Sequence, residues 1–312
     1  MKRICLFAGY DSKNIIHDYV VYYLKELSTV ADVYYMADNE ISDDEKSKIA
    51  PYVKASYGFN HKKYDFGSWH ELIKIIGWEK LSKYNELILA NDSVFGTLYP
   101  IKELFEKLEQ DKEWHICGIN KAVVKNIWHI SSYFLVFKKK AFLSDIFKRH
   151  MESITIEKNS LNVINKYEIP FMEKFYQNNY IVKSFISENV NIYTQWNKFI
   201  EYGSPFIKKR TFITKHMQLK NIKWDKIILE YSNYPINLIQ DYIKKTKSKY
   251  SIAGIIIRNI KIYRKKLFSI NIKKHKKHIK IFGYYLFKKE NKANNNNNSN
   301  ISNICQIKTI QR

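Results

Sequence analysis

Short apolar runs alternate with stretches of helical periodicity along most of the chain before residue 243. The apolar runs are four or five residues long, as buried strands are, and the stretches between them repeat apolar side chains every three or four residues. The predicted strands are Ile4–Ala8, Val33–Met36, Val53–Tyr57, Glu86–Ala90, His115–Ile119, Tyr133–Phe137 and Ile181–Phe185. The predicted helices are Asn14–Leu27, a short helix after Ser42, Ser68–Leu81, Ile101–Leu108, Lys138–Arg149, Ser160–Asn178, Trp196–Ile200 and Ile236–Ile243.

This alternation predicts the fold class. Strands joined by helices of such length form right-handed crossovers, which place the strands parallel in one sheet and the helices on its faces. We therefore expect an α/β protein with a Rossmann-type, mostly parallel sheet and flanking helices. Residues 1–243 are expected to form this domain.

The C-terminal part of the chain has a different composition. The protein has a net charge of +23, and residues 244–292 alone supply +16, because they contain 17 Lys and Arg against one acid, Glu290. Apolar side chains lie among these cations, so Ile255–Phe268 predicts a basic amphipathic helix and Ile279–Leu286 a strand. Residues 293–312 include five consecutive Asn and are expected to be disordered.

The cysteines and the N-terminus indicate a cellular compartment. Cys5, Cys117 and Cys305 are scattered and odd in number, so the sequence indicates neither a disulfide framework nor a zinc site, but buried thiols in a reducing environment. The first apolar run is soon followed by Asp11 and Lys13, unlike a signal peptide. No window of about 18 apolar residues predicts a membrane span. We expect a cytoplasmic protein.

The polar segment Asn91-Asp92-Ser93 is the sharpest candidate site. It directly follows the apolar run Leu87–Ala90, and ligands of open α/β sheets bind beyond the carboxyl ends of the strands. The Asp92 carboxylate can hold a divalent cation against a diphosphate, or it can accept hydrogen bonds from a sugar. The alternative is that Asp92 or Ser93 only caps a loop or short helix.

A second candidate segment is Tyr64–Trp69. Asp65 precedes a predicted helix, so it is a candidate N-cap as well as a candidate ligand or base. Gly67 would let the backbone approach a ligand closely.

Three later positions add chemistry. His129 stands at the entrance of a predicted strand and can act as a base or donate to a phosphate. Glu168 lies on a predicted helix before Pro170, where it is either a general base or an ordinary solvated carboxylate. Gly203–Pro205 predicts a rigid turn that presents the cations Lys208–Arg210, which suit a phosphate or simply face water.

Several enzyme classes leave no trace in the sequence. The phosphate-binding patterns GxGxxG and GxxxxGK[ST], the zinc-protease pattern HExxH and the hydrolase pattern GxSxG do not occur. Dinucleotide oxidoreductases, P-loop kinases, zinc proteases and α/β-hydrolases are therefore disfavoured.

Six segments, in this order, resemble the rhamnan synthesis F family, a group of bacterial proteins associated with rhamnose-containing polysaccharides, lipopolysaccharide and capsule. The resemblance covers about residue 3 to residue 215, and its most specific part is ANDSVFG at Ala90–Gly96. The six segments are Phe7–Asp11, Tyr64–Trp69, Leu89–Pro100, His129–Phe137, Tyr167–Ile169 and Gly203–Lys208.

Two departures from that family stand near the candidate site. The family usually has His where this chain has Gly9, so any role of that His is absent here. The family also has an Asn-x-Gly before the Tyr-Asp pair, where this chain has His61 and Lys63 in the Asn and Gly positions. Donor contacts at this loop are not carried over.

The resemblance implies a glycosyltransferase with a GT-A-like sheet and a nucleotide-sugar donor. In that fold an acidic motif after a central strand binds the donor diphosphate, commonly through Mg or Mn. Asp92 is the candidate metal ligand, although Asn91 and Ser93 stand where a DxD motif has its other residues. The expected donor-binding residues are Gly67, Asn91, Asp92, Ser93, Lys208 and Arg210, and the candidate bases for the acceptor hydroxyl are Asp65, His129 and Glu168.

The basic segment 244–292 predicts a partner. Lys and Arg among apolar side chains suit the anionic inner face of a bacterial membrane, where lipid-linked acceptors are carried, so we expect peripheral attachment there. One alternative is a non-catalytic scaffold in a polysaccharide assembly complex. Another is a nucleic-acid-binding protein that uses the tail to contact phosphates. Because the charge is confined to one end and no nucleic-acid module is recognised, we expect no nucleic-acid partner.

Overall fold

The computed structural model describes residues 1–111, 113–124, 127–213, 223–246, 278–281 and 284–288. The chain divides into two compact units, Met1–Thr246 and Lys247–Arg312. In the second unit, β11 (His278–Ile281) and β12 (Tyr284–Lys288) pair as antiparallel strands where a strand is predicted. The predicted amphipathic helix Ile255–Phe268 and the Asn-rich tail lie outside the described residues.

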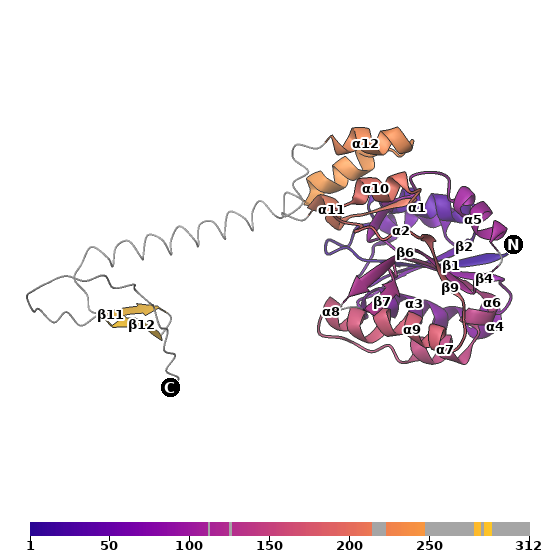
Figure 1. Cartoon of the computed structure of the whole chain (residues 1–312), viewed down its shortest axis with the longest axis horizontal. Coiled ribbons are helices and arrows are strands. Elements are labelled where there is room, and N and C mark those ends of the chain that lie inside the picture. The colour runs from indigo at the N-terminus through magenta and orange to yellow at the C-terminus, as the bar shows by residue number, and fades with distance from the viewer. Residues whose placement is uncertain (112, 125–126, 214–222, 247–277, 282–283, 289–312) are drawn as a thin grey trace, which may run out of the picture. The chain divides into compact units, whose positions relative to one another are not determined.

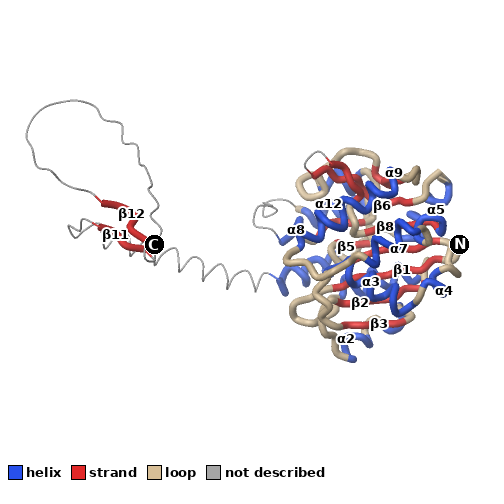
Figure 2. The backbone as a smooth tube through the Cα atoms, turned by 90° about the horizontal axis from the view of Figure 1, so that it is seen from below, coloured by secondary structure: helices blue, strands red, loops and turns tan. Residues whose placement is uncertain are grey.

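The first unit is built on an eight-stranded mixed sheet. Its strand order is β3-β2-β1-β4-β8-β6-β7, with β9 also pairing with β6 (Figure 2). Strands β3, β2, β1 and β4 are parallel, as are β6 and β9, whereas β8 is antiparallel to both β4 and β6, and β7 to β6. The bounds are β1 (Arg3–Gly9), β2 (Asp32–Ala37), β3 (Ala55–Gly58), β4 (Glu86–Asn91), β6 (Ile116–Val124), β7 (Ile127–Ile130), β8 (Phe134–Lys138) and β9 (Val182–Ile186). The predicted α/β class with a mostly parallel sheet is confirmed.

Helices cover both faces of this sheet (Figure 1). One face packs against α1 (Asp18–Ser28), α5 (Ile101–Gln110) and α10 (Trp196–Glu201), and the other against α3 (Tyr64–Ile76), α7 (Asp145–Glu152) and α9 (Ile169–Gln177). Strand β1 shows why both layers form: Cys5 and Phe7 enter one core, while Ile4 and Leu6 enter the other. A strand covered on both sides reads as a continuous apolar run, which is the pattern seen in its sequence.

The remaining elements are short. They are α2 (Asp43–Ser47), η1 (Ala50–Tyr52), α4 (Trp78–Leu81), β5 (Val94–Gly96), α6 (Lys139–Phe142), α8 (Ser160–Val163), the π-helical turn η2 (Ile164–Glu168), β10 (Phe206–Lys208), α11 (Arg210–Ile213), α12 (Trp224–Tyr231) and a helix over residues 236–246. Cys5 and Cys117 are buried free thiols, as predicted. Among the described residues, no helix combines the length and the apolar character needed to cross a membrane.

The structure corrects several predicted boundaries. The helix predicted over Ser68–Leu81 begins at Tyr64 and is broken at Gly77, where φ is 80°. Asp65 therefore lies in the first turn of α3, and the prediction that it is the N-cap is wrong, because Lys63 holds that position. The helix predicted over Lys138–Arg149 is two helices, α6 and α7, and α1 begins four residues later than Asn14.

Strands β5 and β10 are absent from the sequence-based prediction. They form a separate two-stranded sheet, which brings the segment around Lys208 close to the end of β4. They pair as an antiparallel ribbon in which Lys208 lies opposite Val94. The segment predicted as a rigid turn that presents three cations is thus partly a strand, with Phe206 and Ile207 buried. Its pairing with β5 places Lys208 beside the end of β4.

Candidate functional site at the carboxyl ends of the strands

The turn that follows β4 is held between its neighbours. The N–H of Asp92 donates to the carbonyl of Ala8 on β1 at 3.1 Å, and the N–H of Asn91 donates to the carbonyl of Tyr133, just before β8, at 3.1 Å. The turn thus continues the sheet ladder by one residue on each side. It lies at the carboxyl end of a parallel strand, which is where the sequence predicts a ligand site.

Asn91 connects this turn to α3. Its side-chain amide donates to Oδ2 of Asp65 at 2.7 Å, and its Oδ1 accepts from both the N–H and the hydroxyl of Ser93, at 3.1 and 2.7 Å. Asn91 is buried, so these contacts satisfy both ends of its amide. The structure therefore brings together Asp65, Asn91 and Ser93, all of which are predicted site residues.

Lys208 completes that chain of contacts from β10. Its ammonium donates to the Ser93 hydroxyl at 3.0 Å and lies 4.1 Å from the centre of the Tyr133 ring. Burial lowers the pKa of Lys208 to about 8, against the opposing effect of Glu168 and Asp65. A buried cation with a lowered pKa beside two carboxylates is typical of functional sites and is unlike a solvated surface charge.

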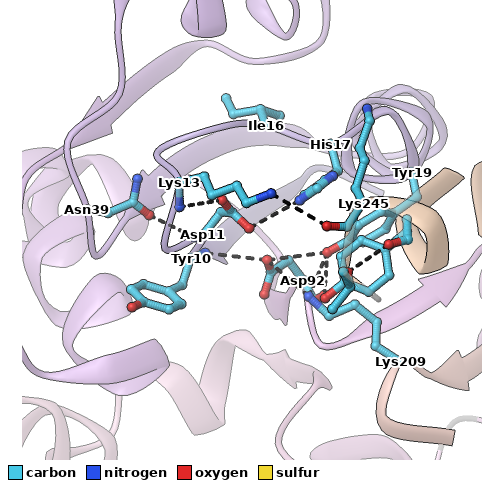
Figure 3. A network of polar contacts seen from close by, with 12 residues as sticks. Tyr10, Asp11, Lys13, Ile16, His17, Tyr19, Asn39, Asp92, Lys209 and Lys245 are labelled. Atoms are coloured by element: carbon cyan, nitrogen blue, oxygen red, sulfur yellow. Dashed lines mark hydrogen bonds and ion pairs between the residues drawn. The ribbon is translucent and has the colours of Figure 1, made fainter. Parts of the chain in front are cut away.

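Asp92 lies in a second network, on the other side of the turn (Figure 3). Its Oδ2 is 3.3 Å from Nζ of Lys209 and 3.4 Å from both the N–H of Tyr10 and the hydroxyl of Tyr19. Lys209 also donates to the Tyr19 hydroxyl at 2.6 Å. Lys209 is the main residue missing from the predicted site, and its one sequence signal is its place between Lys208 and Arg210.

Glu168 and His129 form a third group. Oε1 of Glu168 accepts from the N–H of Ser132 at 2.9 Å and lies 4.0 Å from Nε2 of His129. Burial lowers the pKa of His129, although Glu168 opposes this effect. His129 is only 4% exposed, and its Nδ1 has no hydrogen-bond partner within the described part of the chain. It is a neutral neighbour of Glu168 rather than an accessible base.

Electrostatic interactions link the three groups. Burial and the charges of Asp92 and Glu168 raise the pKa of Asp65, Lys208 and Lys209 lower it, and the net result is a pKa of about 7. Three carboxylates and at least two ammonium groups thus influence one another. They come from α3, the β4–β5 turn, η2 and the end of β10, which are far apart in the sequence.

Two predicted residues stand apart from these contacts. Gly67 is buried in α3, and a Cβ there would lie 2.1 Å from Cβ of Lys63 and 2.9 Å from Nδ1 of His61. Close packing of the preceding loop therefore explains this glycine without a ligand. Arg210 is exposed at the start of α11 and hydrogen-bonds Tyr193, so it borders the site from outside.

Gly9, at the end of β1, has a similar steric explanation. A Cβ at this position would lie 2.2 Å from the hydroxyl oxygen of Tyr35 on β2. The space that the resembling family gives to a His is thus filled by a tyrosine of the neighbouring strand. The packing of Tyr35 therefore explains why this chain has Gly rather than His at position 9.

The residues around Asp92 do not fit a divalent cation. Mg²⁺ is commonly held by one or two carboxylates together with substrate phosphates, and no group of three His, Cys, Asp or Glu suited to a metal occurs among the described residues. The Asp92 carboxylate is already paired with Lys209, and the ammonium of Lys208 is close enough to Lys209 for the two charges to repel each other. A dication would have to enter beside both of these cations.

The fold and the contacts described above define an α/β protein with a charged candidate site at the carboxyl ends of its parallel strands. The sequence model of rhamnan synthesis protein F matches residues 33–295, so the chain belongs to this family. The match includes the β4–β5 turn, Glu168 and the cations after β10.

Solved structures with a similar arrangement include sugar-transferring enzymes. A nucleotide-diphospho-sugar transferase from Desulfovibrio desulfuricans is 12% identical with a TM-score of 0.35, and 77% of this chain covers 97% of it. The glycosyltransferase GlyE of Streptococcus pneumoniae is 12% identical with a TM-score of 0.45, and 78% of this chain covers 64% of it, less than two thirds of its length. A mannosyltransferase from Pyrobaculum calidifontis, solved with GDP-Man and Mn²⁺, is 8% identical with a TM-score of 0.37, and 64% of this chain covers 60% of it. None of the curated proteins matches in sequence.

Proposed function

We propose that this protein is a glycosyltransferase that moves a sugar, rhamnose or another hexose, from a nucleotide-sugar donor to a growing surface polysaccharide or a lipid-linked acceptor. The observation that supports it most is the chain of hydrogen bonds from Asp65 through Asn91 and Ser93 to Lys208 at the carboxyl ends of the strands. Membership of the rhamnan synthesis F family supports a sugar as the transferred group. We also propose that the nucleotide sugar binds at the carboxyl ends of the strands, as in GT-A-like enzymes.

Glu168 is the best placed base for the acceptor. One of its oxygens, Oε1, is fixed by Ser132, which leaves Oε2 without a hydrogen-bond partner among the described residues, and the side chain is 17% exposed. In the transfer step, Oε2 takes the proton of the acceptor hydroxyl as that oxygen bonds to the anomeric carbon. The bond from this carbon to the donor phosphate oxygen breaks, and the diphosphate leaves.

The other two candidate bases have supporting roles. Asp65 is half-protonated near neutral pH, because its pKa is about 7, and it is engaged with Asn91. It therefore holds Asn91, and through it Ser93, in position. His129 is buried beside Glu168 and limits the orientations available to that carboxylate.

The departing diphosphate needs positive charge close to it, as does any leaving group that becomes more anionic in the transition state. Lys208 supplies such a charge from within the site, and Arg210 supplies one at its border. Asp92, on the other side of the same turn, accepts a hydrogen bond from a hydroxyl of the donor sugar.

Sugar transfer by the full chain, followed by product mass with a panel of nucleotide sugars, tests this function. Asp92→Asn keeps the size of the side chain but weakens its acceptance of a sugar hydroxyl, so we expect transfer to fall about tenfold or more. Asp43→Asn, at the exposed start of α2, is the matched control. Transfer at the wild-type rate by Asp92→Asn would contradict the proposed site.

The basic segment 244–292 supports a location for this reaction. We propose that its excess of 16 positive charges holds the protein at the anionic cytoplasmic face of the membrane, near lipid-linked acceptors. Removal of the residues after Tyr250 should release the protein from vesicles that contain anionic lipid, measured by co-sedimentation. Equal sedimentation of both proteins would refute this attachment.

A further inference from the structure

The site contains positive charge at the position where a metal-dependent transferase would hold a cation. Lys208 reaches the hydroxyl of Ser93, and Lys209 reaches the carboxylate of Asp92, so two ammonium groups contact consecutive residues of one turn. The backbone fixes their origin, because the N–H of Lys209 donates to the carbonyl of Ser93 at 3.0 Å. The β5–β10 ribbon thus delivers both cations as a unit.

We propose that Lys208 and Lys209 together bind the diphosphate of the donor, in place of a divalent cation held by Asp92. This inference rests on the proposed function and adds to it both a residue, Lys209, and a metal-independent mode of donor binding. Asp92 then serves as the counter-ion of Lys209 in the free enzyme. The incoming diphosphate takes over that pairing, and the Asp92 carboxylate becomes available to the sugar.

Aromatic contacts hold both lysines in place before any ligand arrives. The ammonium of Lys208 lies 4.1 Å from the Tyr133 ring centre, and that of Lys209 lies 5.1 Å from Tyr19 and 5.3 Å from Tyr242. Lysine side chains lose much rotamer freedom when they bind a phosphate, and pre-ordering them removes part of that cost. The arrangement therefore resembles a prepared anion site more than a solvated surface.

The surrounding charges favour an anion over a dication. Asp65, Asp92 and Glu168 roughly balance the two lysines in the free enzyme, and burial raises the pKa of Asp65 so that this carboxyl is partly neutral near pH 7. When Arg210 at the border is included, whose charge also acts on Lys208, the local charge is slightly positive. A diphosphate would be attracted to it, whereas Mg²⁺ or Mn²⁺ would meet two ammonium groups and one carboxylate that is already paired.

Binding of nucleoside diphosphates to the full chain tests this inference directly. Isothermal titration with UDP, GDP and dTDP is performed once in EDTA and once in Mn²⁺. We expect at least one of them to bind with similar affinity in both buffers. Lys209→Met, which keeps the length of the apolar stem, should weaken that binding at least tenfold, on the order expected for a lost charged hydrogen bond, and Lys209→Arg should restore most of it.

Two further variants make the result specific. Lys148→Met removes a partly buried lysine that lies 5.5 Å from the Trp78 ring, outside the site, and should leave binding unchanged. Asp92→Asn should keep or strengthen diphosphate binding in EDTA, because it frees Lys209, although it lowers transfer. Unfolding midpoints of the ligand-free variants identify any loss of binding that is due to unfolding.

The possible outcomes separate this inference from the proposed function. Binding that requires Mn²⁺ and is lost in Asp92→Asn would overturn the lysine mode but leave the transferase standing. No binding of any nucleoside diphosphate, with or without Mn²⁺, would overturn both. Binding in EDTA that depends on Lys209 and not on Asp92 supports both.

Discussion

The two ends of the same strand pair, β1 and β4, show opposite uses of charge. At the amino end, Arg3 lies opposite Glu86 in the parallel register and pairs with it at 2.6 Å, and it also pairs with Glu109 and stacks on Phe105 at 4.2 Å. At the carboxyl end, Ala8 lies opposite Asn91, where the cluster of carboxylates and lysines begins. The charges at the amino end pair with one another, so we call it the closed end, and we call the carboxyl end, where the cluster lies, the open end.

The two ends differ in how completely their charged side chains are paired with opposite charges. Arg3 is buried, and its guanidinium has two carboxylate partners and an aromatic face. At the carboxyl end, Asp65 and Lys208 have pKa values shifted toward their neutral forms, to about 7 and about 8. Shifts of this kind, produced by burial together with nearby charges, are typical of functional sites.

The largest expected effect is on catalysis at the open end. Glu168→Gln keeps the oxygen that accepts from Ser132 but cannot take a proton, so sugar transfer should fall roughly 10²- to 10⁴-fold with little change in stability. Initial rates at saturating donor measure this. Glu173→Gln, an exposed carboxylate on the neighbouring helix α9, is the control and should keep the wild-type rate. A wild-type rate in Glu168→Gln would return the base to Asp65 or His129.

The next effect should appear in stability at the closed end. Glu86→Gln leaves the buried guanidinium of Arg3 with Glu109 as its remaining carboxylate, so the free energy of unfolding should fall by about 3 kcal/mol, the low end for a broken buried pair. Denaturant titration measures it. Transfer per folded molecule should not change, since this pair lies at the opposite end of the strands.

An exposed ion pair provides the control for that comparison. Asp111 and Lys183 are 2.7 Å apart with side chains 46% and 38% exposed, so Asp111→Asn should lower the free energy of unfolding far less than Glu86→Gln does. If Glu86→Gln and Asp111→Asn had equal effects, the amino end of the sheet would not be stabilised by its buried pair.

Much of the sheet could be predicted because its strands are buried on both faces. The central residues of β1, β2 and β4 form short continuous apolar runs, and the length of these runs indicates buried strands. The short strands β5 and β10 carry no such signal, since each has three residues and depends on the other for pairing. The start of α3 was also misplaced, because Lys63 makes no side-chain cap and Tyr64 has a positive φ of 58°.

The site was only partly predictable for the same reason. Asn91, Asp92 and Ser93 follow a recognisable strand, so their position at its carboxyl end could be inferred. The approach of Lys208 and Lys209 could not, because the β5–β10 pairing joins residues more than 100 positions apart. The resemblance to a family grouped Lys208 with the turn, but the ion pair between Lys209 and Asp92 required three-dimensional contacts.

The last expected effect is a change in how stability depends on pH at the open end. An aspartate has a pKa of about 3.9 in an unfolded chain, whereas burial and the charge of Asp92 raise the pKa of folded Asp65 to about 7. The folded protein therefore binds this proton more tightly between about pH 4 and pH 7, so the contribution of Asp65 to stability falls as the pH rises through that window and levels off above it. Asp65→Asn cannot lose a proton and lacks this decline. Wild type should thus lose stability relative to Asp65→Asn between pH 5 and pH 8 in denaturant titrations. Asp111→Asn is the control, because the hydrogen bond from Lys183 lowers the pKa of Asp111 and this carboxylate stays ionised over that range. Its stability should therefore differ from that of wild type by a constant amount. Parallel pH profiles for wild type and Asp65→Asn would show that Asp65 is ionised as in water, and that the open end is no less balanced than the closed one.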